Sequence, residues 1–154
     1  MKLHKKVVGF SLLFFTLACA NQPFYDVYKS TVNRRWHHHE KQAFQVHIHE
    51  NDARYDVWIY IRHTGEYDFA NLFFLSHETG PQLKDSSYRY ELKLSTPDGR
   101  WIGKNAGNLY ENKLLLKENH VFPDTGIYTF EIEQNMQENP ISNITDIGLK
   151  IIKK

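Results

Sequence analysis

Apolar and polar residues alternate along most of the chain that follows the first two dozen positions. In the segment 44–49, Phe44, Val46 and Ile48 are separated by polar residues, and the segment 55–62 repeats this spacing. Because successive side chains of a strand point to opposite faces, each segment predicts a strand with one face in the core. The same spacing predicts further strands at 25–32, 72–77, 88–95, 114–116, 126–134 and 144–152.

Residues that favour chain reversal separate these segments, with Gly, Pro, Asn or Asp at 51–52, 63–65, 79–81, 97–99 and 123–126. No stretch shows the spacing of an amphipathic helix. About seven to nine short strands with frequent turns are typical of antiparallel all-β folds. We therefore expect a single all-β domain over residues 25–154, an antiparallel β-sandwich or a jelly-roll-like fold. The segment 100–112, rich in Gly and Asn, predicts its longest surface loop.

The first eighteen residues have the layout of a secretory signal peptide. Lysines at positions 2, 5 and 6 precede an uncharged, mostly apolar run at 7–18. This run is shorter than the ~20 residues that a membrane-spanning helix needs. We therefore expect residues 1–18 to direct export and then to be removed.

The chain has one cysteine, Cys19, at the point where such a signal would be cut. With Thr16-Leu17-Ala18 before it, Cys19 resembles the lipid-bearing residue of bacterial lipoproteins, in which the thiol takes a diacylglyceryl group and the new amino group takes a fatty acid such as palmitate. Several acyl chains hold a protein durably at a membrane. The alternative is an ordinary secretory signal cut near Ala18 or Ala20. In the lipoprotein interpretation, residues 19–24 are the lipidated cysteine and a short tether.

The charge of the chain argues against nucleic acid as a partner. The 154 residues carry a formal net charge of +1 at pH 7, with 19 Lys and Arg against 18 Asp and Glu. Three of the lysines belong to the signal peptide, so the mature chain has 16 basic and 18 acidic residues and a net charge of −2. Proteins that bind the phosphate backbone usually carry a clear positive excess.

Aromatic residues are the most distinctive candidates for a contact site. Trp58 and Tyr60 fall on the face opposite the apolar side of their predicted strand, whereas Trp101 falls in the predicted loop. Covering by a loop such as 100–112 is the simplest interpretation of Trp58 and Tyr60. Alternatively they form an exposed platform, which would contact a protein partner or stack on a sugar ring.

Histidines are the most conspicuous candidates for metal ligands, at positions 37, 38, 39, 47 and 49. We nevertheless expect no metal site, because no carboxylate or cysteine is spaced to complete the coordination. The segment 99–105 lacks the spacing and the Ser or Thr of a phosphate-binding loop. No nucleophile motif or distinctive carboxylate pair occurs either. We therefore expect a protein that is not an enzyme and has no cofactor and no small-molecule substrate.

Several sequence blocks together resemble the gliding motility lipoprotein GldH family of the Bacteroidetes. The blocks are Asn71-Leu72-Phe73, Tyr90-Glu91-Leu92, Pro97 to Gly103, Glu111-Asn112-Lys113, Phe122-Pro123, Gly126 to Phe130, Glu133 to Met136 and Ile144 to Ile151. They cover most of the mature chain, in the family's order and at similar spacing.

The resemblance implies a lipid-anchored envelope protein of the gliding machinery, which is linked to type IX secretion in these bacteria. It transfers one residue role, lipidation at Cys19, and no catalytic residue. We expect the protein to face the periplasm, because Ala20-Asn21-Gln22 contains no acidic export-like run, and to act through contacts with other gliding or secretion proteins. The alternative is a surface glycan-binding module that uses Trp58, Tyr60 or Trp101.

Overall fold

The alternating segments form strands whose apolar sides meet between two antiparallel sheets. The computed structural model describes residues 23–154, and this part of the chain contains no helix, and therefore none that could span a membrane. The all-β prediction is thus confirmed. The strands are β1 (Tyr25–Ser30), β2 (Arg35–Trp36), β3 (Gln42–Ile48), β4 (Tyr55–Thr64), β5 (Asn71–Thr79), β6 (Ser86–Lys93), β7 (Lys104–Ala106), β8 (Leu109–His120), β9 (Gly126–Gln134), β10 (Ile141–Ser142) and β11 (Ile144–Lys153).

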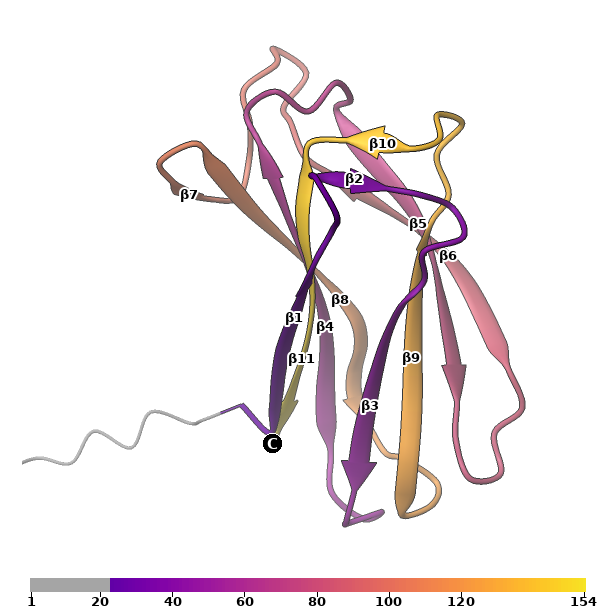
Figure 1. Ribbon diagram of the computed structural model, residues 1–154. Coiled ribbons are helices and arrows are strands. Elements are labelled where there is room, and N and C mark those ends of the chain that lie inside the picture. Colours follow the sequence, from indigo (N-terminus) through magenta and orange to yellow (C-terminus); the bar gives the residue numbers. More distant parts are fainter. Residues whose placement is uncertain (1–22) are drawn as a thin grey trace, which may run out of the picture.

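The strands are arranged as a sandwich of two layers with a short ribbon across one end (Figure 1). One sheet has the order β1-β11-β4-β8-β7, the other has the order β3-β9-β5-β6, and β2 pairs with β10 in the ribbon. Every pairing between these strands is antiparallel. The β-sandwich prediction is therefore confirmed.

The core lies between the two layers and is formed by the inward residue of each alternating pair. Strand β4 shows this most clearly, because Val57, Ile59 and Ile61 are fully buried while the residues between them are partly exposed. Each such side chain contributes roughly 1.5–3 kcal/mol when it leaves water. From the other strands, the core includes Phe44, Val46, Ile48, Leu72, Phe74, Phe130, Ile132, Ile147, Leu149 and Ile151.

The prediction of a long loop over 100–112 is wrong for most of its length. Lys104–Ala106 forms β7 and pairs with β8, which begins at Leu109. Gly107 has a φ of 67° at the first central position of the two-residue turn between them, where a tight hairpin favours glycine. Strand β7 contains only three residues, all exposed, so it has no apolar alternation by which it could be recognised.

The two ends of the described chain lie together at one end of the sandwich (Figure 1). Tyr25, the first residue of β1, pairs with Ile151 near the end of β11. The ring of Phe24 lies 5.4 Å from that of Tyr55. The predicted signal peptide and Cys19 lie outside the described residues, so their roles stay predictions. The chain nevertheless enters the domain at this end, which we call the entry end.

Candidate interaction surface

The outer face of the five-stranded sheet carries the aromatic pair singled out in the sequence. Trp58 and Tyr60 point away from the core because they alternate with Val57, Ile59 and Ile61 on β4. Both are partly buried. Their neighbours are cross-strand residues, since Trp58 pairs with Lys150 on β11 and Tyr60 pairs with Lys113 on β8.

Cations from neighbouring strands lie over the rings on this face. The Nζ atom of Lys113 is 4.7 Å from the ring centroid of Trp58, and that of Lys150 is 5.0 Å from the centroid of Tyr60. These distances are typical of cation–π contacts, which are worth about 0.5–1 kcal/mol at exposed sites. Charged side chains of neighbouring strands therefore lie over both rings of the aromatic pair.

Two of the charged groups on this face, Lys150 and Glu111, have partners nearby. Lys150 Nζ lies 2.9 Å from Asp26 Oδ2 on β1, and this hydrogen bond raises the pKa of Lys150 above its usual range. Glu111 Oε2 accepts hydrogen bonds from Arg62 Nε at 2.7 Å and from the Tyr28 hydroxyl at 3.1 Å. Lys150 is therefore protonated at neutral pH, and Arg62 offsets the negative charge of Glu111.

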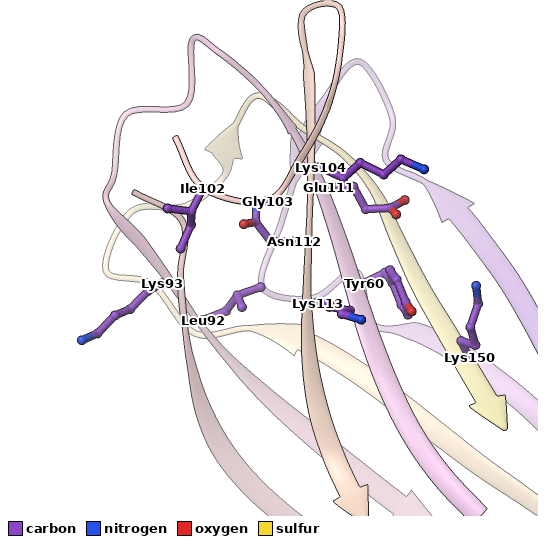
Figure 2. Close-up of a pocket in the computed structure, with 10 residues that line it drawn as sticks. All are labelled: Tyr60, Leu92, Lys93, Ile102, Gly103, Lys104, Glu111, Asn112, Lys113 and Lys150. Atoms are coloured by element: carbon purple, nitrogen blue, oxygen red, sulfur yellow. The ribbon is translucent and has the colours of Figure 1, made fainter. Parts of the chain in front are cut away.

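A groove of about 490 Å³ opens beside Tyr60 (Figure 2). We call it the lysine groove, because four of its lining residues are lysines and only one is acidic. Figure 2 shows Lys113 and Lys150 near Tyr60, whereas Lys93 points away from that ring. The groove is lined by Tyr60, Leu92, Lys93, Ile102, Gly103, Lys104, Glu111, Asn112, Lys113 and Lys150.

Gly103 lets the chain pass close to β8 at the wall of the lysine groove. Its φ is +96°, and a Cβ atom at this position would lie 2.4 Å from the Glu111 carbonyl oxygen and 2.5 Å from the Asn112 side-chain oxygen. Residues with a side chain are strained in this backbone region and would clash here. Glycine is therefore required for the wall formed by residues 102–104.

Trp101 lies apart from Trp58 and Tyr60, in a cluster at the end of the core around His63. Its ring centroid is 4.7 Å from that of His63, and its indole Nε1–H donates a hydrogen bond of 3.3 Å to the Gly65 carbonyl. The His63 ring, which is fully buried, also stacks on Tyr110 at 5.6 Å. The structure thus brings together Trp58 and Tyr60 but not Trp101.

His63 is buried as a neutral ring. Its Nδ1 lies 2.9 Å from the Thr64 carbonyl oxygen, which only accepts, so Nδ1 carries the proton. The Nε2 atom then accepts from the Asn112 amide at 3.1 Å. Burial lowers the pKa of His63. Both nitrogen atoms of this buried ring therefore have hydrogen-bond partners within the domain.

The histidines proposed as possible metal ligands form two separate pairs. The rings of His37 and His39 lie 5.1 Å apart, and those of His47 and His49 lie 4.0 Å apart. The fifth, His38, has its Nε2 at 3.0 Å from the Met136 carbonyl oxygen. Between residues 23 and 154, no group of three or more His, Cys, Asp or Glu is arranged to hold a metal ion.

The lysines of the groove were not selected from the sequence. Lys93, Lys104, Lys113 and Lys150 lie on β6, β7, β8 and β11, and only the strand order brings them together. The alternation of β4 predicts that Tyr60 faces outward. It does not predict that Lys113 is the cross-strand neighbour of Tyr60, because that register joins residues more than fifty positions apart.

Comparisons with known proteins agree on one family. The family model described as "GldH lipoprotein" matches residues 23–151. A "gliding motility lipoprotein GldH homolog" from Christiangramia forsetii is 32% identical over 151 residues, covering 94% of this chain and 91% of the relative. The "gliding motility lipoprotein GldH" of Flavobacterium johnsoniae is 27% identical over 144 residues, with 89% of each chain covered. No solved structure matches the chain.

Proposed function

The chain belongs to the GldH lipoprotein family, and on that premise we propose that it is a lipid-anchored, non-enzymatic component of the gliding machinery that acts through protein–protein contacts. Cys19 is the proposed lipid attachment site. The domain faces the periplasm in this proposal, and its partners are gliding or type IX secretion proteins of the envelope.

The observation that carries the proposal is the cation-covered aromatic face around Trp58 and Tyr60. Aromatic side chains and neighbouring charges are the groups that anchor protein interfaces. Sugar stacking needs a ring face that the ligand can reach. Because Lys113 lies over Trp58 and Lys150 lies over Tyr60, this surface favours a protein partner over the glycan alternative.

Anchoring increases the occupancy of such a contact. A protein confined to one membrane surface meets its partners there at a high effective concentration, so a modest interface is well occupied. The entry end would lie toward the lipid, because residues 19–24 separate Cys19 from β1 and six extended residues span at most ~20 Å. The outer face of the sheet is then a side face of the domain, and neighbouring proteins on the same membrane can contact it.

The test is a mild cross-link of an epitope-tagged copy in intact cells, followed by purification from membranes and mass spectrometry. We expect gliding or secretion envelope proteins to be recovered with the native chain and lost with Cys19→Ala. Recovery of the chain without any partner would contradict the proposal. A Trp58→Ala variant that instead loses binding to a glycan array would establish the alternative.

The lipid itself is tested separately. We expect metabolic labelling with a palmitate analogue to mark the native chain and not the Cys19→Ala chain. Equal labelling of both, or membrane retention and processing that are unchanged by the substitution, would show that Cys19 does not carry the anchor.

A further inference from the structure

We propose that the lysine groove binds an extended, acidic polypeptide segment of a second envelope protein. This inference rests on the proposed function and names the chemistry of the partner. The groove is lined by four lysines and one glutamate, Glu111, and Glu111 is already paired with Arg62. It therefore presents an excess of positive charge.

The charge of the groove contrasts with that of the rest of the domain. The described residues carry 16 Lys and Arg against 18 Asp and Glu, a net charge of −2, whereas the groove lining carries a net charge of +3. All other described residues therefore sum to −5. Charge separated in this way attracts a negative partner to one place and repels it elsewhere.

The shape of the surface favours an extended occupant. A second hollow of about 290 Å³ is lined by Arg62, Lys104, Ala106, Leu109 and Glu111. It shares Lys104 and Glu111 with the lysine groove, so the two hollows adjoin at these residues. Two adjoining hollows, each lined by cations, fit carboxylates spaced along a chain.

Three of the lysines are free to pair with such carboxylates. Within residues 23–154, Lys93, Lys104 and Lys113 take part in no ion pair, whereas Lys150 is held by Asp26. The Trp58 ring fixes the position of the Lys113 ammonium. Less side-chain entropy is then lost when a carboxylate binds to it.

The position of the groove favours a protein over a membrane surface. Tyr60 and Lys113 are level with Tyr28 in β1, and Lys104 pairs with Glu111, which lies two residues further from the entry end than Lys113. The groove thus lies on the side of the sandwich, displaced from the end where the chain enters. Lipid headgroups beneath the entry end would meet other residues first.

The binding test uses the full-length lipoprotein purified in detergent. The probe is a fluorescein-labelled peptide of alternating Glu and Ser, and its Gln–Ser counterpart is the neutral control. We expect the acidic peptide alone to bind, with an affinity that falls as salt rises. The double variant Lys104→Glu with Lys113→Glu should weaken binding by about tenfold or more. The matched double variant Arg34→Glu with Lys84→Glu, at exposed positions outside the groove, should change it by less than about twofold.

Competitors separate the acidic peptide from other anions. Vesicles of phosphatidylglycerol and phosphatidylcholine test a lipid surface, and alginate tests an acidic glycan. The proposal is overturned if the native chain does not bind the acidic peptide, or if both double variants weaken it equally. It is also overturned if the groove variant loses vesicle or alginate binding while peptide binding is unchanged. Unchanged circular dichroism and urea midpoints show that the variants fold.

Cross-linking in cells distinguishes this inference from the proposed function. If the native chain recovers a partner and the Lys104→Glu, Lys113→Glu variant recovers the same amount, the groove proposal fails and the function stands. If the native chain recovers no partner, the function itself fails. We expect the partner to be recovered by the native chain and strongly reduced with the groove variant.

Discussion

The cluster around His63 and the cluster around Tyr60 both combine aromatic rings with nitrogen bases, and both are built on β4. The two residues lie three positions apart and therefore face opposite sides of the sheet. His63 points between the sheets, where the rings of Trp101 and Tyr110 surround it and burial lowers its pKa. Tyr60 points outward, beneath a lysine whose pKa is raised by Asp26.

The two clusters differ in charge and in whether we expect them to affect stability or binding. The inner base is neutral because no opposite charge compensates for its loss of water. Lys150 of the outer cluster stays charged because Asp26 lies beside it. We therefore expect substitutions in the His63 cluster to change stability, and substitutions in the Tyr60 cluster to change binding.

Replacing the tryptophans of the two clusters gives the largest contrast. We expect Trp101→Ala to lower the free energy of unfolding by about 3 kcal/mol, because a cavity opens beside His63 and Tyr67. Trp58→Ala should lower it by only about 1 kcal/mol, because that ring is covered on the solvent side by one lysine. Urea unfolding followed by circular dichroism measures both. Equal losses would show that the two rings are equally structural.

Gly103 links the two clusters, because Trp101, two residues before it, packs in one and its own backbone forms part of the wall of the groove. We expect Gly103→Ala to cost about 2 kcal/mol or more, since the new Cβ would meet the Glu111 carbonyl oxygen. Gly107→Ala is the control, because Gly107 also has a positive φ but no atom within 4 Å of an added Cβ. It should cost about 1 kcal/mol. Similar thermal midpoints for the two variants would contradict the close approach at Gly103.

Acid should destabilise the folded chain through two histidines, His63 of the inner cluster and His120 near the entry end. The pKa of His63 is lowered by burial, and that of His120 is lowered to about 4 by burial and by Lys117. Below pH 6.5 the unfolded chain binds protons that these folded rings exclude, so stability falls as the pH falls. We expect His63→Gln to remove about 1 kcal/mol of the loss between pH 6.5 and 5. If the free energy of unfolding, measured by urea titration, depends on pH in the same way in the native chain and in His63→Gln, His63 is protonated in the folded state over this range.

The smallest effect on stability is expected at the outer face. Lys113→Met keeps the aliphatic stem over Trp58 and removes the ammonium, so the free energy of unfolding should change by less than about 0.5 kcal/mol. The same variant should bind the acidic peptide less tightly. A large loss of stability would place Lys113 with the structural residues and remove the contrast between the clusters.

The strands could be predicted wherever one face is apolar. Strand β9 has the predicted bounds, and β11 differs by one residue. Strands β2, β7 and β10 were missed because two or three residues are too few to show a period of two. Gly107-Asn108 was the available signal for the β7–β8 hairpin, since Gly-Asn between two strands favours a tight turn.

The site could be predicted only in part. Alternation along β4 is sufficient to place Trp58 and Tyr60 on the outer face. The lysines over them come from other strands, so their contribution depends on register between distant segments. The environment of Trp101 was also inaccessible, because its contacts with His63 and Gly65 join residues more than thirty positions apart. Local pattern determines which face a residue takes, whereas its neighbours depend on tertiary structure.

The position of β1 has a mechanical consequence. It is an edge strand that starts at Tyr25 and pairs with β11 through six consecutive residues. If a partner bound away from the entry end holds the domain, a force on the tether before β1 acts along the axis of β1. All six pairings would then carry the load together, in shear, instead of opening one after another. The strand that leads toward the proposed anchor is thus joined to the domain in the geometry that best withstands traction.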